Sequence, residues 1–137
     1  MKAVNITLTF NGQTEAAFNF YKSVFGGEFI HVQRMKEMPA PQPLSPEEGE
    51  KILHVALPIG GSVLAGMDVP QGMPQSISGT NFMVTLETSS EEETKTLYEG
   101  LSAGGSIMMA LDNQFWGAYF GMFTDKFGIQ WMVSYMK

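Results

Sequence analysis

The stretch Asn5-Ile6-Thr7-Leu8-Thr9-Phe10 decides the fold, because the similar stretch Asn81-Phe82-Met83-Val84-Thr85-Leu86 returns 76 positions later in the chain. Each stretch alternates apolar residues with polar or smaller ones, which is typical of a half-buried β-strand. A segment with helical spacing follows each stretch, and a glycine pair ends each segment, at Gly26-Gly27 and at Gly104-Gly105. A repeat of this length predicts a duplicated half-domain and not a solenoid unit. Two such halves side by side would share a groove.

The pattern predicts the same order of elements in both halves. In the first half it predicts strands over 3–10, 28–34, 51–58 and 62–67, with a helix over 14–25. In the second half it predicts strands over 81–86, 106–111, 115–124 and 129–135. The second helix starts in a capping box, with Ser90 as the N-cap and Glu93 reaching back. The predicted fold class is therefore α+β, a single domain of two βαβββ modules, 1–68 and 79–137, joined by the linker 69–78.

Composition limits the classes of function. The net charge of −6 argues against nucleic acid or an anionic membrane as a partner. The chain has no cysteine, which excludes disulfides, thiolate nucleophiles and zinc–thiolate sites. No apolar run approaches the roughly 18 residues of a membrane-spanning helix, and no basic and apolar leader opens the chain. We therefore expect a cytoplasmic protein with no membrane partner.

The segment 36–50 carries Pro39, Pro41, Pro43 and Pro46 and ends in acidic residues. Proline removes the N–H donors that a strand ladder needs, so this segment is predicted to be a loop. A loop of this length is either a functional flap or a merely mobile segment, and the sequence favours the mobile one.

The alternation of each strand assigns its side chains to two faces. Ile6, Leu8 and Phe10 should meet the helix, which leaves the alternate residues of the same strand toward the groove. In the second half, the same alternation predicts that the side chains at positions 81, 83 and 85 point toward the groove. In the last strand it predicts the same for the side chains at positions 130, 132 and 134. The rule predicts a groove lined by Asn5, Thr7, Thr9, Asn81, Met83, Thr85, Gln130, Met132 and Ser134. Amides, hydroxyls and thioethers suit a mostly apolar small molecule, although the protein's own side chains filling the groove is the alternative.

Four further residues could serve a ligand. His54 is the best acid–base candidate because the unperturbed pKa of imidazole is near neutral, although a hydrogen-bonded structural role is the alternative. Phe115 and Trp116 are predicted to form an aromatic lip for a planar ligand, with core packing or dimer burial as alternatives. Arg34 would bring a positive charge to the groove mouth for an anionic ligand, or it would end a strand in solvent. No Ser-His-Asp motif is present.

The paired βαβββ modules resemble the vicinal oxygen chelate superfamily, which includes glyoxalase I, extradiol dioxygenases and bleomycin-binding proteins. The resemblance is closest to its PhnB-like branch, on the stretches LTFNG (8–12), AFNFYKSVFGG (17–27), FWGA (115–118) and TDKFGIQW (124–131). This resemblance implies cupped mixed sheets, a homodimer, and a divalent metal ion held in each cup. Branch members are often named as methyltransferases, but no Gly-rich nucleotide-binding turn follows a strand here.

The metal ligands of the superfamily are usually His, Glu, His and Glu, and they come from the first and fourth strands of each module. Carried onto this chain by the resemblance, these positions are Asn5, Ala65, Asn81 and Met132. Alanine has no donor, a thioether is soft, and an amide oxygen binds Ca²⁺ or Mg²⁺ only together with carboxylates. We therefore predict no metal site and no cofactor, which puts glyoxalase and dioxygenase activities in doubt.

The leading hypothesis is a metal-independent protein that binds a small molecule of unknown identity. Its predicted ligand-binding residues are Asn5, Thr7, His54, Asn81, Met83, Trp116, Gln130 and Met132. The first alternative is a metal-dependent lyase, isomerase or dioxygenase whose metal is held by His31, His54 and a carboxylate. The second alternative is a structural dimer with a vestigial groove. The expected partners are the small-molecule ligand and a second copy of the chain.

Overall fold

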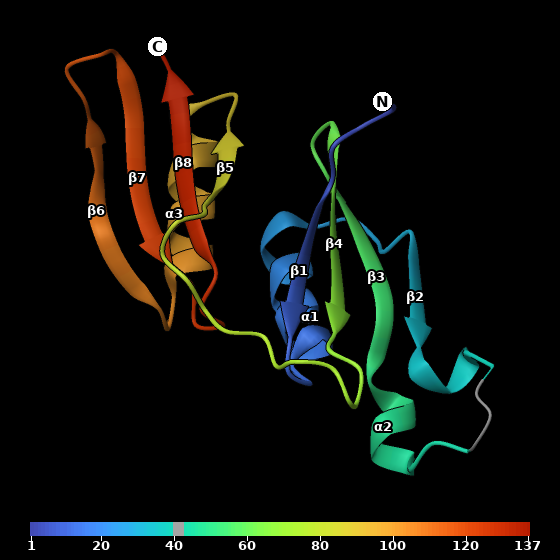
Figure 1. Ribbon diagram of the computed structural model, residues 1–137. Helices are drawn as coiled ribbons and strands as arrows, with labels where there is room; N and C mark the ends of the chain where they lie inside the picture. Colours follow the sequence, from blue (N-terminus) through green and yellow to red (C-terminus); the bar gives the residue numbers. More distant parts are fainter. Residues whose placement is uncertain (40–42) are drawn as a thin grey trace. The chain divides into compact units, whose positions relative to one another are not determined.

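The computed structural model describes residues 1–39 and 43–137. The chain divides into two compact units, Met1–Ile77 and Ser78–Lys137, and each is a four-stranded mixed sheet with a helix on one face (Figure 1). The strand order is β1-β4-β3-β2 in the first sheet and β5-β8-β7-β6 in the second. Each unit thus follows the strand–helix–strand–strand–strand order, which confirms the predicted α+β fold class. No helix in the described ranges is long and apolar enough to cross a membrane.

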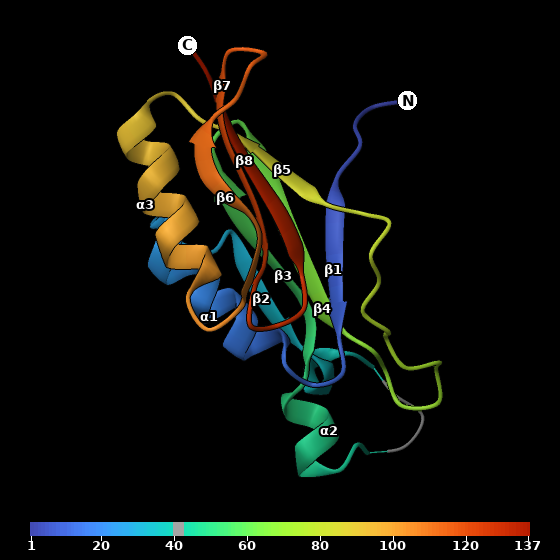
Figure 2. The same cartoon turned by 90° about the vertical axis from the view of Figure 1, so that its left-hand side faces the viewer.

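In each unit the long helix lies against one face of its own sheet (Figure 2). The first unit consists of β1 (Ile6–Phe10), α1 (Thr14–Phe25), β2 (His31–Arg34), the 3-10 helix η1 (Met35–Glu37), α2 (Pro46–Glu50), β3 (Ile52–Ile59) and β4 (Ser62–Asp68). The second consists of β5 (Val84–Glu87), α3 (Glu91–Ser102), β6 (Ser106–Asn113), β7 (Ala118–Thr124) and β8 (Gln130–Met136). In each sheet the first strand pairs parallel with the last, and the remaining pairs are antiparallel.

The core of the first unit forms where α1 packs on β3 and β4. Phe18 and Tyr21 of α1 are fully buried, and their rings meet edge to face at a centroid distance of 5.4 Å. Phe18 lies so close to Gly66 that a Cβ at this glycine would overlap the ring. Burying a large apolar side chain contributes about 1.5–3 kcal/mol, so this close packing holds α1 on the sheet.

A buried carboxylate fixes the start of α1. Asp68, at the end of β4, is 1% exposed and accepts hydrogen bonds from the backbone N–H groups of Gly12, Thr14 and Ile52 at 2.8–3.1 Å. It also accepts the Thr14 hydroxyl at 2.7 Å. The N-cap residue Gln13 makes no side-chain cap bond, so Asp68 takes over this role from 54 positions away in the sequence. The sequence analysis missed this role because the contact joins residues 54 positions apart, which no local pattern reveals.

Local signals in the second unit were interpreted correctly. The Ser90 hydroxyl accepts the Glu93 N–H at 3.0 Å, which confirms the predicted N-cap of α3. The Glu93 carboxylate reaches back to the N–H of Ser89 at 2.9 Å, one residue before the expected partner. In the turn between β7 and β8, Asp125 accepts two backbone N–H groups and also the indole N–H of Trp131 at 2.8 Å.

The prediction of an unbroken loop over 36–50 was wrong at both ends, because side chains close two short helices there. Ser45 caps α2 by accepting the N–H of Glu48 at 3.2 Å. Lys36 pairs with Glu50 at 2.6 Å and so joins η1 to α2. Residues 40–42, including the predicted loop proline Pro41, lie outside the described residues, so the choice between a flap and a mobile segment stays a prediction.

The predicted strand over 81–86 was wrong at its start, since β5 begins at Val84. The Gln130 side chain donates its amide hydrogens to the carbonyls of Gly79 at 3.0 Å and Phe82 at 2.8 Å, which holds this segment outside the ladder. The ladders pair Leu8 with Gly66 and Leu86 with Val133. If the last hairpins of the two units are matched at the predicted shift of 67, Gly66 corresponds to Val133. Their ladder partners, Leu8 and Leu86, then correspond at a shift of 78 positions and not at the predicted 76.

Candidate functional site

The candidate site lies on the face of the first sheet that points away from α1, here called the first open face. The registers place one residue from each strand in a single row: Thr7 pairs with Ala65, Ala65 with Ala56, and Ala56 with His31. Side chains alternate between the faces of a strand, and the adjacent Leu8, Leu64 and Val55 lie in the core. The row therefore points away from the helix, as predicted for Thr7.

The centre of this row is a floor of small side chains. Ala65 and Ala56 each carry only a methyl group, so neither side chain rises far above the sheet, and neighbouring side chains leave them 6% and 4% exposed. A hydroxyl lies at one end of the row, on Thr7, and an imidazole lies at the other, on His31. Such a surface can hold a flat apolar group and hydrogen-bond a polar atom at either end.

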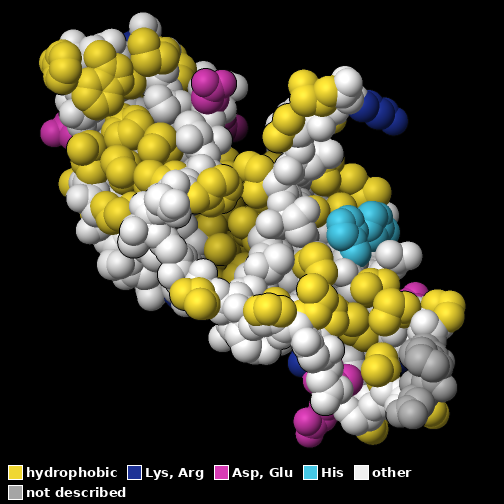
Figure 3. All heavy atoms as spheres, in the orientation of Figure 1, with side chains coloured by type: hydrophobic (Ala, Val, Ile, Leu, Met, Phe, Trp, Pro, Cys, Tyr) yellow, Lys and Arg dark blue, Asp and Glu magenta, His cyan; other side chains and the backbone are white. Residues whose placement is uncertain are grey.

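The two histidines of the chain meet on this face. His31 lies opposite Ala56, two positions along β3 from His54, so the two imidazoles are diagonal neighbours. Nε2 of His31 lies 2.5 Å from Nδ1 of His54, and the rings stack at 4.7 Å with an interplanar angle of 25°. Figure 3 shows them as one patch on the surface of this face. The sequence analysis left their convergence open, because it depends on the register of β2 against β3.

The environment of the pair favours a neutral His54. Burial is the larger cause that lowers the pKa of His54 below its usual value, and the charge of His31 is the second. A hydrogen bond between two imidazoles needs at least one ring with an unprotonated nitrogen, which a lowered pKa supplies. The bond uses one nitrogen of each ring, so the other nitrogen of each can face a ligand.

The second open face, which points away from α3, carries a different row at the same strand positions. Thr85 pairs with Met132, Met132 with Met122, and Met122 with Met109. Trp116, in the turn between β6 and β7, packs edge to face on Phe120 at 5.5 Å. Large apolar side chains gather on this face (Figure 3). The exposed large apolar residues of the second unit are Phe82, Ile107, Met108, Met109, Phe115, Trp116 and Met136.

The predicted site residues fall in different surroundings. Asn5 is exposed just before β1, while Thr7 and His54 share the first open face. Met132 and Trp116 lie on the second unit. Asn81 and Met83 belong to the segment before β5, and the corrected shift makes Met83 the counterpart of Asn5. Gln130 is 8% exposed and commits its amide hydrogens to backbone carbonyls, so its side chain also has a structural role.

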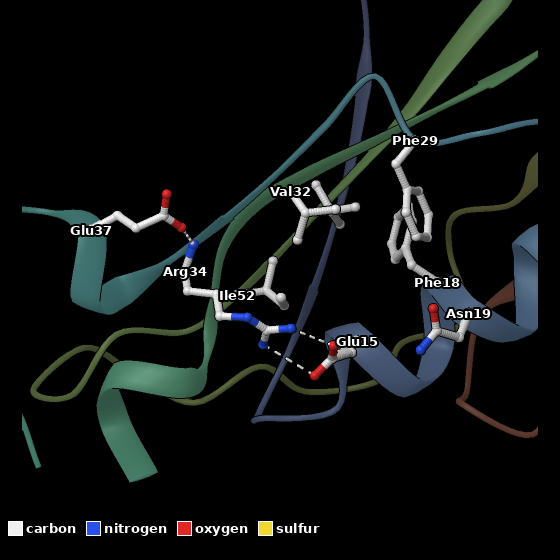
Figure 4. Close-up of a pocket in the computed structure, with 9 residues that line it drawn as sticks. Glu15, Phe18, Asn19, Phe29, Val32, Arg34, Glu37 and Ile52 are labelled. Atoms are coloured by element: carbon white, nitrogen blue, oxygen red, sulfur yellow. Dashed lines mark hydrogen bonds and ion pairs between the residues drawn. The ribbon is translucent and has the colours of Figure 1, made fainter. Parts of the chain in front are cut away.

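A cavity of about 330 Å³ lies on the opposite, helix-covered side of the first sheet, between α1 and β2 (Figure 4). Its lining is Glu15, Phe18, Asn19, Phe29, Val32, Arg34, Glu37, Ile52 and Val55. The Arg34 guanidinium donates to both oxygens of Glu15, at 3.1 Å from Nη1 and 2.5 Å from Nη2. Arg34 therefore points to the helix side of its strand and not, as the sequence analysis considered, to a groove on the open side.

Comparison with known proteins identifies the family. The chain matches the glyoxalase/bleomycin resistance protein/dioxygenase superfamily over residues 3–133. The chain belongs to this superfamily. It is 32% identical to the protein YjdN of Escherichia coli K12 over 138 residues, which cover 95% of this chain and 92% of that protein.

Two solved structures are similar over 98% of this chain. The protein PA1353 from Pseudomonas aeruginosa has a TM-score of 0.82 and 34% identity, with 98% of its own chain covered. A PhnB protein from Bacillus cereus has a TM-score of 0.77 and 24% identity, with 99% of its chain covered, and shares the fold. The resemblance to the superfamily is confirmed, and PhnB-like proteins are among its structural neighbours.

The donor set on the open faces does not fit the divalent ion that the resemblance to the superfamily implied. The paired positions on the first and last strands are Thr7 with Ala65 and Thr85 with Met132, and none of them is a carboxylate or an imidazole. Within residues 1–39 and 43–137, no three His, Asp or Glu side chains lie together as a metal site requires. The bonded nitrogens of the histidine pair are 2.5 Å apart, whereas tetrahedral ligands at about 2.0–2.1 Å from an ion lie about 3.3 Å from one another.

Proposed function

We propose that this member of the superfamily binds a small molecule on the open faces of its sheets, without a metal ion. The observation that supports the proposal is the composition of the two rows. The four positions that the resemblance assigns to metal ligands hold two amides, a methyl group and a thioether, and the two rows add threonine hydroxyls beside them. These groups bind organic molecules through apolar contact and hydrogen bonds, but they do not hold a hard divalent ion.

The first open face supports a flat ligand with polar atoms at both ends. Neighbouring strands lie about 4.7–4.9 Å apart, so the outer strands of this sheet are about 14 Å apart. The Thr7 hydroxyl and the His31–His54 pair would hydrogen-bond the two ends, and the floor of Ala65 and Ala56 would carry the apolar middle. A molecule of one or two rings matches this span.

The second open face supports binding of apolar surfaces by flexible side chains. Methionine side chains are flexible and polarisable, so they adapt to apolar surfaces of different shapes. A large exposed apolar patch is typical of an interaction surface. We propose that a second copy of the chain covers part of this face in a cytoplasmic homodimer, and that the methionine row and Trp116 contact the ligand or the partner.

Ligand binding is tested on protein that is purified without a histidine tag and treated with a chelator. A panel of small ring compounds is screened by thermal shift, because a ligand at a hundred times its Kd stabilises the native state by about 2.7 kcal/mol. We expect a hit that survives chelation and weakens at least tenfold in Thr7→Val or His54→Gln. A hit that needs one equivalent of Ni²⁺, Zn²⁺, Fe²⁺ or Mn²⁺ would contradict the proposal. The absence of any hit would favour a structural dimer.

The histidine pair favours an enzyme as the second candidate. A neutral His54 bonded to His31 is arranged as a general base with a proton partner. This fits the lyase or isomerase alternative without a metal step. Once a ligand is known, turnover that falls at least a hundredfold in His54→Gln while binding weakens only a few-fold would decide for catalysis, whereas equal losses in both would decide for binding.

A further inference from the structure

The cavity beside α1 exists because the helix leaves one strand of the first sheet uncovered. α1 packs on β3 and β4, whereas the edge strand β2 is joined to it by the ion pair of Arg34 with Glu15. Val32 of β2 is 40% exposed, while Val55, its ladder partner on β3, is 2% exposed. The helix-facing side of β2 therefore borders a gap and not the core.

The gap has the size and lining of a ligand site. Pockets that bind small molecules measure about 300–1,000 Å³ and are mostly apolar with a few polar groups, and this one measures about 330 Å³. The rings of Phe18 and Phe29 form one wall, and the branched side chains of Val32 and Ile52 form the other (Figure 4), with Val55 also in the lining. Filling it with an apolar group would remove this surface from water.

The charges at the rim favour a cation. Two carboxylates and one guanidinium line the cavity, so its formal charge is −1. Nη1 of Arg34 donates hydrogen bonds to Glu15 and to the Glu50 carbonyl, and Nη2 donates one to Glu15. Within the described residues, Glu37 accepts the Arg34 backbone N–H at 2.6 Å, and carboxylate oxygens keep further lone pairs. The remaining hydrogen-bonding capacity is therefore mainly that of acceptors.

Two lysines near the rim do not change this balance, and one of them, Lys36, is paired with Glu50 at 2.6 Å. Lys22 lies over the outer wall, with its Nζ 5.1 Å from the centre of the Phe29 ring. Its charge is paired with Glu28 at 3.0 Å, outside the cavity. The Arg34 hydrogen bond is the largest cause that lowers the pKa of Glu15, so this carboxylate stays ionised near neutral pH.

We infer that this cavity is a second binding site, separate from the open faces, for a small organic amine with an apolar body. The body lies against Phe18, Phe29 and Val32, and the ammonium group pairs with Glu37 and Glu15 at the rim. An organic carboxylate of the same shape is rejected, because it would have to displace Glu15 from Arg34 and would face Glu37. The inference does not depend on the function proposed for the open faces.

The first experiment uses the unmodified protein. The methyl signals of Val32, Ile52 and Val55 are followed by NMR while 2-phenylethylammonium is added, and the titration is repeated with 3-phenylpropionate. We expect saturable shifts of these methyl signals with the amine and at least tenfold weaker binding of the carboxylate. Equal or tighter binding of the carboxylate, shifts confined to other residues, or no saturable shift would each overturn the inference.

Variants then test separately how the volume of the cavity and the charge at its rim contribute to amine binding. Val32→Phe fills the gap and should weaken amine binding at least tenfold, whereas Ser62→Phe, which adds the same ring at an exposed position of β4, should leave it unchanged. Glu37→Gln keeps the acceptor for the Arg34 N–H and removes the charge, and it should weaken binding about 3- to 10-fold. Glu99→Gln on α3 is its matched control. Wild-type affinity in both Val32→Phe and Glu37→Gln would overturn the inference.

Discussion

The open faces of the two sheets share a strand order but differ in chemistry. In the first unit the row across the sheet is Thr7, Ala65, Ala56 and His31, and in the second it is Thr85, Met132, Met122 and Met109. Both rows start with a threonine on the parallel edge strand. The first row continues with the small side chains of two alanines and ends in the titratable ring of His31. The second row continues with the long, flexible and apolar side chains of three methionines. The duplicated fold therefore sets where side chains project, and the residue at each position sets what they can bind.

The units also differ in how their helices begin, and this difference gives the largest expected effect. Asp68→Ala would leave four donors of the first unit, three of them buried, without their acceptor, which should lower the free energy of unfolding by about 3–5 kcal/mol. Ser90→Ala removes a local cap in the second unit and should cost about 1 kcal/mol. Urea unfolding of both variants measures the contrast. Equal losses would show that the long-range carboxylate adds nothing beyond an ordinary cap.

Each unit places a glycine under a helix aromatic, and the two should differ in tolerance. Gly66→Ala puts a methyl group into the fully buried Phe18 ring and should destabilise the protein by about 3 kcal/mol. Gly121→Ala brings a methyl group to 3.0 Å from the half-buried Tyr98, which can shift outward, and to 3.2 Å from the Leu111 Cα, so a smaller loss of about 1–2 kcal/mol is expected. Thermal unfolding compares the two. A larger loss at Gly121 would reverse the order of packing tightness inferred here.

The histidine pair should make stability depend on pH in a way that the methionine row cannot. The pKa of His54 is lowered in the folded protein, mainly by burial, so the unfolded chain binds its proton more readily. Stability from this group is complete above the unfolded pKa of about 6.5 and is lost as the pH falls through the folded value. Denaturant midpoints at pH 7.5, 6.5 and 5.5 should fall on acidification.

The matched variants for this pH series are His54→Gln and Met109→Leu. We expect His54→Gln to flatten the pH dependence and Met109→Leu to keep the wild-type curve, because the second row has no titratable side chain. A wild-type slope in His54→Gln would assign the effect to other groups.

Metal addition should give the smallest effect. Neither row offers a carboxylate, so equimolar Zn²⁺ or Ni²⁺ should move the melting temperature of the tag-free protein by less than about 1 °C. Differential scanning calorimetry with and without a chelator measures this. A saturable rise that disappears in His31→Ala would place an ion on the histidine pair and remove the main argument for metal-independent binding.

The sequence by itself determined the elements whose signals are local. The helix Thr14–Phe25 has the predicted bounds, the Ser90–Glu93 pair starts α3, and Asp125 forms its turn. In each case a side chain or a glycine acts on backbone within a few residues, so the pattern alone contains the cause. The repeated strand–helix order was visible for the same reason, and with it the superfamily.

Only the tertiary structure decided the contacts that depend on which strands pair and in what register. Asp68 accepts a hydrogen bond from Thr14, the Gln130 side chain bonds the Phe82 carbonyl before β5, and His31 contacts His54. These partners are 23 to 54 positions apart in the chain. Taking the repeat at 76 and not at 78 is an error of two residues, which keeps each side chain on its face but matches Asn5 with Asn81 where the ladders match it with Met83. The composition of the candidate site is a property of that register, which no local pattern contains.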